Sequence, residues 1–228
     1  MAEPAYLGIC FDLDGTLLDT LDDLAAAVNR ALARHGYPPH PAESYKRFVG
    51  DGASVLIQRA LPPAVRDDAG QVARCLADFR TEYDQAWSVR SRLYDGVAEM
   101  LDLCAARRLR LAVVSNKPHP YTLACMQRFF ARWPFGAIHG QQDGVPRKPD
   151  PATTRQAARE LDLSPGDMLF VGDSNVDMQT GAAAGMLPVG VAWGYRPVDE
   201  LIEAGARHIL QSPGELRLVL DSAPAAEG

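Results

Sequence analysis

The sequence predicts an α/β fold: a doubly wound parallel sheet covered by helices on both faces, with a small all-helical insert after the first strand. From residue 93 onward, short apolar runs alternate with stretches of helical periodicity, which is the pattern of parallel strands joined by crossover helices. From residue 19 to residue 90 the pattern is helical throughout and contains no good strand. We therefore expect a sheet domain made of residues 1–18 and 91–228, and a helical domain made of residues 19–90.

Composition narrows the class of protein. Hydrophobic residues make up 47% of the 228 residues and charged residues 23%, which is ordinary for a globular protein with a sizeable core. The formal net charge is −6 without a basic block, which argues against nucleic acid as the main partner. No apolar stretch approaches the roughly 18 residues of a membrane span. Because the first four residues lack the basic region of a signal peptide, we expect a cytoplasmic protein.

The individual elements follow from periodicity and from turn residues. A buried strand is predicted over 6–11, where a short apolar run precedes the turn formers Gly15 and Thr16. Asp19 and Thr20 offer a cap for a helix to about His35. Further helices are predicted over 42–48, 53–61, 69–88, 97–108, 118–130, 151–161, 176–184, 198–204 and 214–220. Further strands are predicted over 110–114, 137–139, 168–171, 187–191 and 208–210, and residues 223–228 are expected to fray.

Cysteine and histidine give no sign of a metal or disulfide framework. The four cysteines lack close pairing and are expected to be buried free thiols: Cys10, Cys75, Cys104 and Cys125. The five histidines are scattered along the chain, which argues against a zinc site.

Four polar clusters lie just past an apolar strand or on a loop between elements. They are Asp12–Thr16, Ser115–Lys117, Arg147–Pro151 and Gly172–Asp177. Taken singly, each has an ordinary explanation as a turn, a helix cap or a surface charge. Since residues that follow parallel strands converge on one edge of the sheet, the four clusters are expected to share one site.

The charges of these clusters predict the kind of ligand. Four carboxylates would come together with one lysine placed to offset them: Asp12, Asp14, Asp173 and Asp177 with Lys148. Aspartate oxygens suit Mg²⁺, which commonly also takes a phosphate oxygen. Ser115 and Asn116 would supply neutral donors for the remaining phosphate oxygens. The clusters therefore outline a site for phosphoryl transfer.

In this order, and with a helical insert after the first, the clusters resemble those of the haloacid dehalogenase superfamily of phosphatases, whose core is Rossmann-like. The resemblance implies that Asp12 attacks phosphorus to form an aspartyl-phosphate, and that Asp14 is the general acid and base. It implies Mg²⁺ bound by the side chains of Asp12 and Asp173 and by the backbone carbonyl of Asp14. Lys148 would bridge the nucleophile and the phosphoryl group.

The same resemblance assigns the remaining residues. Ser115, Asn116 and Thr16 would bind the phosphoryl group together with Lys148. Asp177, Gly172 and Ser174 would support the metal site. The residue types also suit the chemistry, because a carboxylate nucleophile divides one difficult displacement into two easier ones. Crowded acidic neighbours would favour the protonated form of Asp14 that the first step needs.

The helical insert resembles the cap of one subgroup of this superfamily, and within it the chain most resembles phosphoglycolate phosphatases. The supporting stretches are Phe48–Gly52, Val55–Leu61, Gly172–Ser174 with Asp177, and Gly194–Tyr195. The expected activity is Mg²⁺-dependent hydrolysis of 2-phosphoglycolate, a small phosphorylated metabolite. Lys46 and Arg59 are candidates for contact with a substrate carboxylate, although a surface role is the more usual one for each of these residue types.

Other readings stay open. A phosphatase for sugar phosphates or pyrophosphate would look similar, and a phosphotransferase or mutase of the same fold would use the same aspartates. A dehalogenase would have no use for the acidic fourth cluster, and a non-catalytic relative would be expected to have lost one of the four clusters. The oligomeric state is not readable from the sequence.

Overall fold

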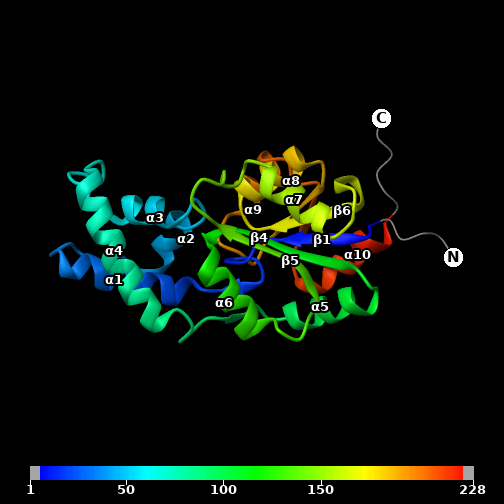
Figure 1. Cartoon of the computed structure of the whole chain (residues 1–228), viewed down its shortest axis with the longest axis horizontal. Coiled ribbons are helices and arrows are strands. Elements are labelled where there is room, and N and C mark those ends of the chain that lie inside the picture. Colours follow the sequence, from blue (N-terminus) through cyan, green and yellow to red (C-terminus); the bar gives the residue numbers. More distant parts are fainter. Residues whose placement is uncertain (1–5, 223–228) are drawn as a thin grey trace.

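The computed structural model describes residues 6–222. Its main sheet has six parallel strands in the order β5-β4-β1-β6-β7-β8, with β1 near the middle (Figure 1). The strands are β1 Gly8–Phe11, β4 Arg110–Pro118, β5 Phe135–Gln141, β6 Met168–Gly172, β7 Leu187–Val191 and β8 His208–Leu210. The chain adds strands on one side of β1 and then on the other, so the order reverses beside β1. The predicted doubly wound parallel sheet is confirmed.

Side chains along the central strands point alternately to the two faces of the sheet, and each face has its own apolar core. Ile9 and Phe11 of β1 belong to one apolar cluster, and Cys10 between them belongs to the other. Helices α5 Val97–Ala106, α6 His119–Phe129 and α10 Leu216–Asp221 cover the first face, and α7 Ala152–Glu160 and α8 Asn175–Ala184 cover the second. Helix α9 Val198–Glu203 packs near β7.

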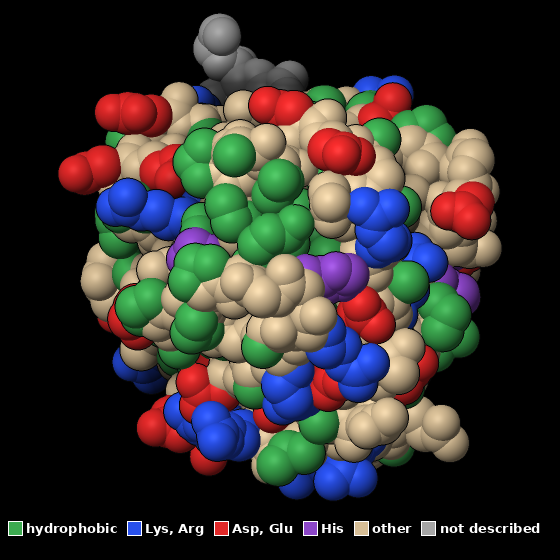
Figure 2. Space-filling model, turned by 90° about the vertical axis from the view of Figure 1, so that its left-hand side faces the viewer, with side chains coloured by type: hydrophobic (Ala, Val, Ile, Leu, Met, Phe, Trp, Pro, Cys, Tyr) green, Lys and Arg blue, Asp and Glu red, His purple; other side chains and the backbone are tan. Residues whose placement is uncertain are grey.

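The remaining helices pack on one another at one end of the molecule, left in Figure 1. They are α1 Leu21–Arg34, α2 Tyr45–Phe48, α3 Ala53–Ala60 and α4 Ala69–Ala86. Their apolar faces form a third cluster, to which the loop between β7 and α9 contributes the buried Tyr195. An ion pair of 2.6 Å between Arg30 and Glu82 joins α1 to α4. On the outer face of this end, acidic and basic side chains intermix with apolar ones (Figure 2).

Two short segments differ from the prediction. Leu18–Asp19 (β2) pairs antiparallel with Arg92–Leu93 (β3), where the chain leaves the sheet for the helical end and where it returns. Residue 19 therefore lies in a strand, although no strand was expected from residue 19 to residue 90. A pairing of two residues leaves no pattern in the sequence, because it forms only when the two crossings are brought side by side.

The strand β4 also runs further than expected. Its predicted end was residue 114, but the strand continues to Pro118 and carries Ser115, Asn116 and Lys117. These polar residues are buried, at about 6% exposure each, so the predicted polar loop is the buried end of a strand.

The structure also bears on the predictions for the cysteines and for membrane-spanning segments. All four cysteines are free and buried, as predicted. Over residues 6–222, no helix combines the length and the hydrophobicity needed to cross a bilayer. The expectations for residues 1–4 and for the frayed tail at 223–228 lie outside the described residues.

Candidate active site

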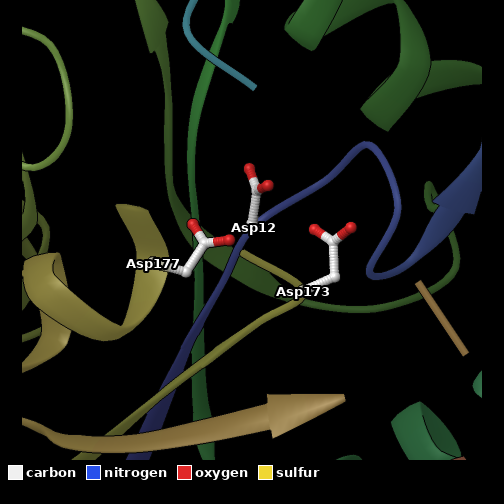
Figure 3. A group of neighbouring side chains, drawn as sticks. All are labelled: Asp12, Asp173 and Asp177. Atoms are coloured by element: carbon white, nitrogen blue, oxygen red, sulfur yellow. The ribbon is translucent and has the colours of Figure 1, made fainter. Parts of the chain in front are cut away.

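Three aspartates bring their carboxylates together at the carboxyl edge of the sheet. Asp12 follows β1, Asp173 follows β6, and Asp177 lies in the first turn of α8. One oxygen of each lies within 4.8 Å of the others, and Figure 3 shows the three carboxylates pointing to the same side. All three residues are buried. The fourth predicted carboxylate, Asp14, is not part of this group.

Lys148 is the cation inside this group. Its Nζ lies 2.9 Å from Asp12 Oδ1 and 2.7 Å from Asp177 Oδ1, and the residue is 7% exposed. Burial raises the pKa of Asp12 to about 6, Lys148 opposes that rise, and Asp177 adds to it. Burial and the charges of Asp177 and Asp12 also raise the pKa of Asp173 well above its usual range. One lysine therefore leaves much of the acidic charge unbalanced.

The oxygens of Asp177 are already engaged. Ser174 caps α8 by accepting from the Asp177 amide, and Asp177 Oδ2 accepts from the backbone and hydroxyl of Ser174 at 3.1 and 2.6 Å. Asp177 Oδ1 accepts a hydrogen bond from the Lys148 ammonium group. Gly172 keeps room for this arrangement, because a Cβ there would lie 2.3 Å from the Asp177 Cβ. Asp177 thus orients Lys148 and leaves Asp12 and Asp173 to meet a cation.

The donor set fits a hard divalent cation. Asp12 Oδ1 lies close to Lys148 but lacks the geometry of a hydrogen bond, so among the described residues it is a buried carboxylate oxygen without a donor. A cation bound beside Asp12 and Asp173 would give that oxygen a partner and would offset the excess negative charge. Carboxylate oxygens are the ligands that Mg²⁺ prefers.

Asp173 is held by several contacts. Its Oδ2 accepts from the Tyr195 amide at 2.8 Å, and its Oδ1 accepts from the Thr16 hydroxyl at 3.3 Å. Gly15, with φ of +86°, lies so close that a Cβ would come within 2.2 Å of Asp173 Oδ2. The fully buried Thr16 does not line the pocket described below. In this structure its hydroxyl orients Asp173, whereas the sequence analysis placed it against the phosphoryl group.

Asp14 has different neighbours from those expected. Both of its oxygens accept from the Lys117 ammonium, at 3.1 and 3.0 Å, and Oδ1 also accepts from the Thr20 hydroxyl at 2.9 Å. The acidic neighbours expected around Asp14 are thus replaced by a lysine and a threonine. Thr20 precedes α1 but makes no side-chain cap there, contrary to its predicted capping role.

Lys117 also contacts the helical end. Its Nζ donates to the Tyr83 hydroxyl of α4 at 2.8 Å, and its side chain is only 3% exposed. Burial lowers the pKa of Lys117, but Asp14 and Tyr83 raise it by more, so the net shift is upward. Asp14 is therefore linked to a helix of the insert through a single ammonium group.

The Asn116 side chain joins three segments. Its Nδ2 donates to the carbonyls of Gly50 at 2.9 Å and Lys148 at 3.2 Å, and its Oδ1 accepts from the Lys148 amide at 3.0 Å. These contacts occupy the amide group that was expected to bind phosphate. Ser115 Oγ accepts from the Lys117 amide at 3.3 Å and lines the pocket.

A pocket lies between the sheet edge and the helical end, with a cavity volume of about 60 Å³. Its floor is polar and its far wall, from the helical insert, is largely apolar. It is lined from the end of β4 and from the loops that follow the strands by Asp12, Asp14, Ser115, Lys117, Asp173 and Arg196, and from the insert by Leu24, Val49, Ala53, Leu56, Phe79 and Tyr83.

Lys46 and Arg59 do not line this pocket. Lys46 pairs with Glu43 at 2.9 Å and Arg59 pairs with Asp51 at 2.6 Å. Both residues therefore form ion pairs outside the pocket, in line with a surface role and not with substrate contact.

Several residues of the site were given no role by the sequence analysis. Lys117 stands inside one of the four clusters, and its position beside Asn116 was the available signal. Tyr83, Thr20 and Tyr195 carry no such signal, because only the packing of the insert on the sheet brings them to Asp14 and Asp173.

Comparison with known proteins shows the family to which the chain belongs. Residues 9–191 match the family of haloacid dehalogenase-like hydrolases, and the chain belongs to that family. The chain is also 36% identical over 203 residues to the phosphoglycolate phosphatase of Pseudomonas putida, which covers 84% of this chain and 72% of that protein.

A further relative and a solved structure are also named as phosphatases. The chain is 33% identical to the N-acetylmuramic acid 6-phosphate phosphatase of Pseudomonas aeruginosa, over 94% of this chain and 95% of that one. A crystal structure from Haemophilus somnus, described as a predicted phosphoglycolate phosphatase, superposes with a TM-score of 0.86 at 30% identity, over 94% of this chain and 98% of the other. The predicted family and the predicted phosphatase class are confirmed.

Proposed function

We propose that this protein is a Mg²⁺-dependent phosphomonoesterase that uses Asp12 as its nucleophile and hydrolyses 2-phosphoglycolate to glycolate and phosphate. One observation carries the proposal: the buried Asp12 carboxylate lines the pocket beside Lys148 and Asp173, with one oxygen lacking a hydrogen-bond donor. A metabolic phosphate ester is the partner, and residues 19–90 are proposed as a cap domain over the catalytic core.

Asp12 and Asp173 would hold the metal ion through their carboxylates, with the backbone carbonyl of Asp14. When bound, Mg²⁺ would supply positive charge against the substrate phosphate and the aspartates. Lys148 supplies the protein's own positive charge beside the nucleophile, and Asp177 orients it. Ser115 offers a hydroxyl to the phosphoryl oxygens from the pocket wall.

The reaction proceeds in two steps. In the first, an Asp12 oxygen forms a bond to phosphorus while the bond to the leaving oxygen breaks, and Asp14 gives that oxygen a proton. In the second, Asp14 takes a proton from water, whose oxygen attacks phosphorus and releases phosphate from Asp12. Each step is a displacement that needs positioning and charge stabilisation above all.

The choice of substrate rests on the relatives and on the pocket. The most similar named relatives include several phosphoglycolate phosphatases. A small and mostly apolar enclosure suits a compact leaving group better than a sugar with many hydroxyl groups, because each buried hydroxyl needs a partner. The P. aeruginosa relative, which aligns over nearly the whole chain, makes N-acetylmuramic acid 6-phosphate the second candidate.

A substrate panel tests the proposal. Phosphate release is measured from 2-phosphoglycolate, N-acetylmuramic acid 6-phosphate, a hexose phosphate and pyrophosphate, with Mg²⁺ and with EDTA. We expect activity only with the metal, and the highest kcat/KM on 2-phosphoglycolate. Turnover that persists in EDTA or in Asp12→Asn protein would contradict the mechanism, whereas a preference for a sugar phosphate would contradict only the substrate.

A further inference from the structure

Two cations line the pocket, and they differ in what they already bind. Arg196 donates to the Val49 carbonyl at 3.1 Å and lies 3.7 Å from Glu200, so its charge is tied to the insert loop and to a neighbouring carboxylate. Lys117 also has a carboxylate partner, Asp14, whose two oxygens accept from its ammonium group at 3.1 and 3.0 Å, but Asp14 and the other partner of Lys117, Tyr83, both line the pocket themselves. An anion that enters the pocket beside Asp14 therefore meets Lys117.

The position of Lys117 assigns it to one end of the substrate. Lys148 lies between Asp12 and Asp177, at the nucleophile. Lys117 lies on Asp14, the residue proposed to protonate the leaving oxygen. Its positive charge thus lies beside the residue that is proposed to face the leaving oxygen.

The surroundings make this charge selective. The wall beyond Lys117 is formed by apolar side chains of the insert, among them Leu24, Leu56 and Phe79. A charge pair in such surroundings is stronger than in water, and a second charged group without a partner would be costly there. The Tyr83 hydroxyl is a neutral acceptor, and charged acceptors form the stronger hydrogen bonds with an ammonium group. When Asp14 carries the proton that the proposed first step requires, Lys117 no longer faces an ionised partner there, and a substrate carboxylate can take the place of Tyr83 on Lys117.

We propose that Lys117 is the specificity-determining residue of this site, and that it binds a carboxylate on the leaving group of the substrate. This inference rests on the proposed phosphatase function and adds a substrate class to it: phosphate monoesters that carry a carboxylate close to the ester oxygen. Glycolate and the lactyl ether of N-acetylmuramic acid both have a carboxylate. The two candidates differ in how far that group lies from the ester oxygen.

The first test measures binding, so it does not depend on turnover. The full-length protein with Mg²⁺ is titrated by calorimetry with 3-phosphonopropionate, in which a methylene replaces the ester oxygen of 2-phosphoglycolate, and with propylphosphonate, which lacks the carboxylate. We expect the carboxylate analogue to bind about 10- to 100-fold more tightly, the ratio expected for one charge-assisted hydrogen bond. Equal affinities in the unmodified protein overturn the proposal whatever any variant does.

Variants then assign the preference to a residue. Lys117→Met should abolish the preference by weakening only the carboxylate analogue, whereas Lys117→Arg should retain most of it. Arg196→Met removes the other pocket cation, and Tyr83→Phe removes the hydroxyl that Lys117 now holds; both should keep the preference. Equal weakening of the two analogues by Lys117→Met, or loss of the preference in Arg196→Met instead, refutes the assignment.

A turnover arm separates this inference from the proposed function. Phosphate release by the unmodified protein and by Lys117→Met is compared for 2-phosphoglycolate and ethyl phosphate, and for N-acetylmuramic acid 6-phosphate and N-acetylglucosamine 6-phosphate. Because both oxygens of Asp14 accept from Lys117, Lys117→Met should lower turnover on every substrate. A further fall of about 10- to 100-fold in kcat/KM on a carboxylate-bearing substrate, relative to its matched substrate without the carboxylate, supports the role of Lys117, and equal falls within each pair refute it. Absence of turnover on every substrate refutes the proposed phosphatase, while the binding preference would still decide the role of Lys117.

Discussion

The Asn116 side chain donates a hydrogen bond of 2.9 Å to the Gly50 carbonyl and thereby joins the end of β4 to the loop between α2 and α3. The same side chain holds the backbone of Lys148 in both directions. Two neighbouring carbonyls of the insert loop accept hydrogen bonds from arginines on loops that follow strands of the sheet: Val49 from Arg196 and Asp51 from Arg147. The insert is thus hydrogen-bonded to the rest of the chain at the residues that hold the backbone of Lys148.

Replacing Asn116 by alanine should therefore affect both stability and activity. It removes three buried or partly buried hydrogen bonds, and we expect a loss of about 1–3 kcal/mol in the free energy of unfolding. The kcat should fall about tenfold or more because Lys148 loses its backbone anchor. Chemical denaturation and steady-state kinetics measure the two effects. Arg147→Ala is the matched control, since its exposed contact to Asp51 should cost much less; equal effects of the two changes would contradict this account.

The raised pKa of Asp12, about 6, predicts the pH dependence of the metal-free protein. A carboxyl whose pKa is higher in the folded state than in the unfolded chain favours folding at low pH, and that contribution is lost as the pH rises through the folded pKa. In EDTA, the contribution of Asp12 to stability should decline between about pH 4 and pH 6.5, by on the order of 1–3 kcal/mol. Mg²⁺ should reverse the decline.

The measurement is the difference in Tm between the unmodified protein and Asp12→Asn across that pH range. The difference isolates Asp12 from Glu82 and Glu160, whose lowered pKa values favour folding at higher pH and act in the opposite direction. In EDTA at pH 7.5 the Asp12→Asn protein should be the more stable of the two. A Tm difference that does not vary with pH would show that the charge of Asp12 does not destabilise the metal-free protein.

The pair of Lys148 and Asp177, 2.7 Å apart and both buried, should behave as a unit. Removing one partner leaves a buried charge without its counterpart, which costs about 3–5 kcal/mol. Lys148→Met should lose activity and stability, and Asp177→Asn should lose activity because Lys148 is no longer oriented. The double variant should be less destabilised than the sum of the two single ones, by about 0.5–3 kcal/mol in a double-mutant cycle. Strict additivity would contradict the coupling.

Gly15→Ala should weaken metal binding more than it weakens the fold. The added Cβ would come 2.2 Å from Asp173 Oδ2, so that Asp173 has to move. Gly36→Ala is the control, because Gly36 also has a positive φ, of +73°, but has open space around the added Cβ. Both should lose about 1 kcal/mol or more to backbone strain. The increase in Tm caused by Mg²⁺ should shrink in Gly15→Ala alone; equal shifts in both variants would mean that Asp173 tolerates the new methyl group.

The sequence alone determined the parallel sheet, the insert and the convergence of Asp12, Lys148, Asp173 and Asp177. The reason is local: short apolar runs specify buried parallel strands, and the carboxyl ends of such strands lie at one edge. Residues placed directly after these strands are therefore brought together by topology. The family resemblance drew on the same residues, and the comparisons confirm the family.

Only the tertiary structure decided what surrounds these residues. Thr16 forms a hydrogen bond with Asp173. Asn116 forms hydrogen bonds with the backbones of Gly50 and Lys148. Lys117 donates to Asp14 and to Tyr83. Each of these contacts spans dozens of positions along the chain or joins the insert to the sheet, so no spacing in the sequence indicates it. A polar side chain in a motif names the chemistry that is available, but its partner is set by which groups are buried with it and need a hydrogen bond. For that reason Asp14 proved to be paired with a lysine, where the sequence had suggested acidic neighbours.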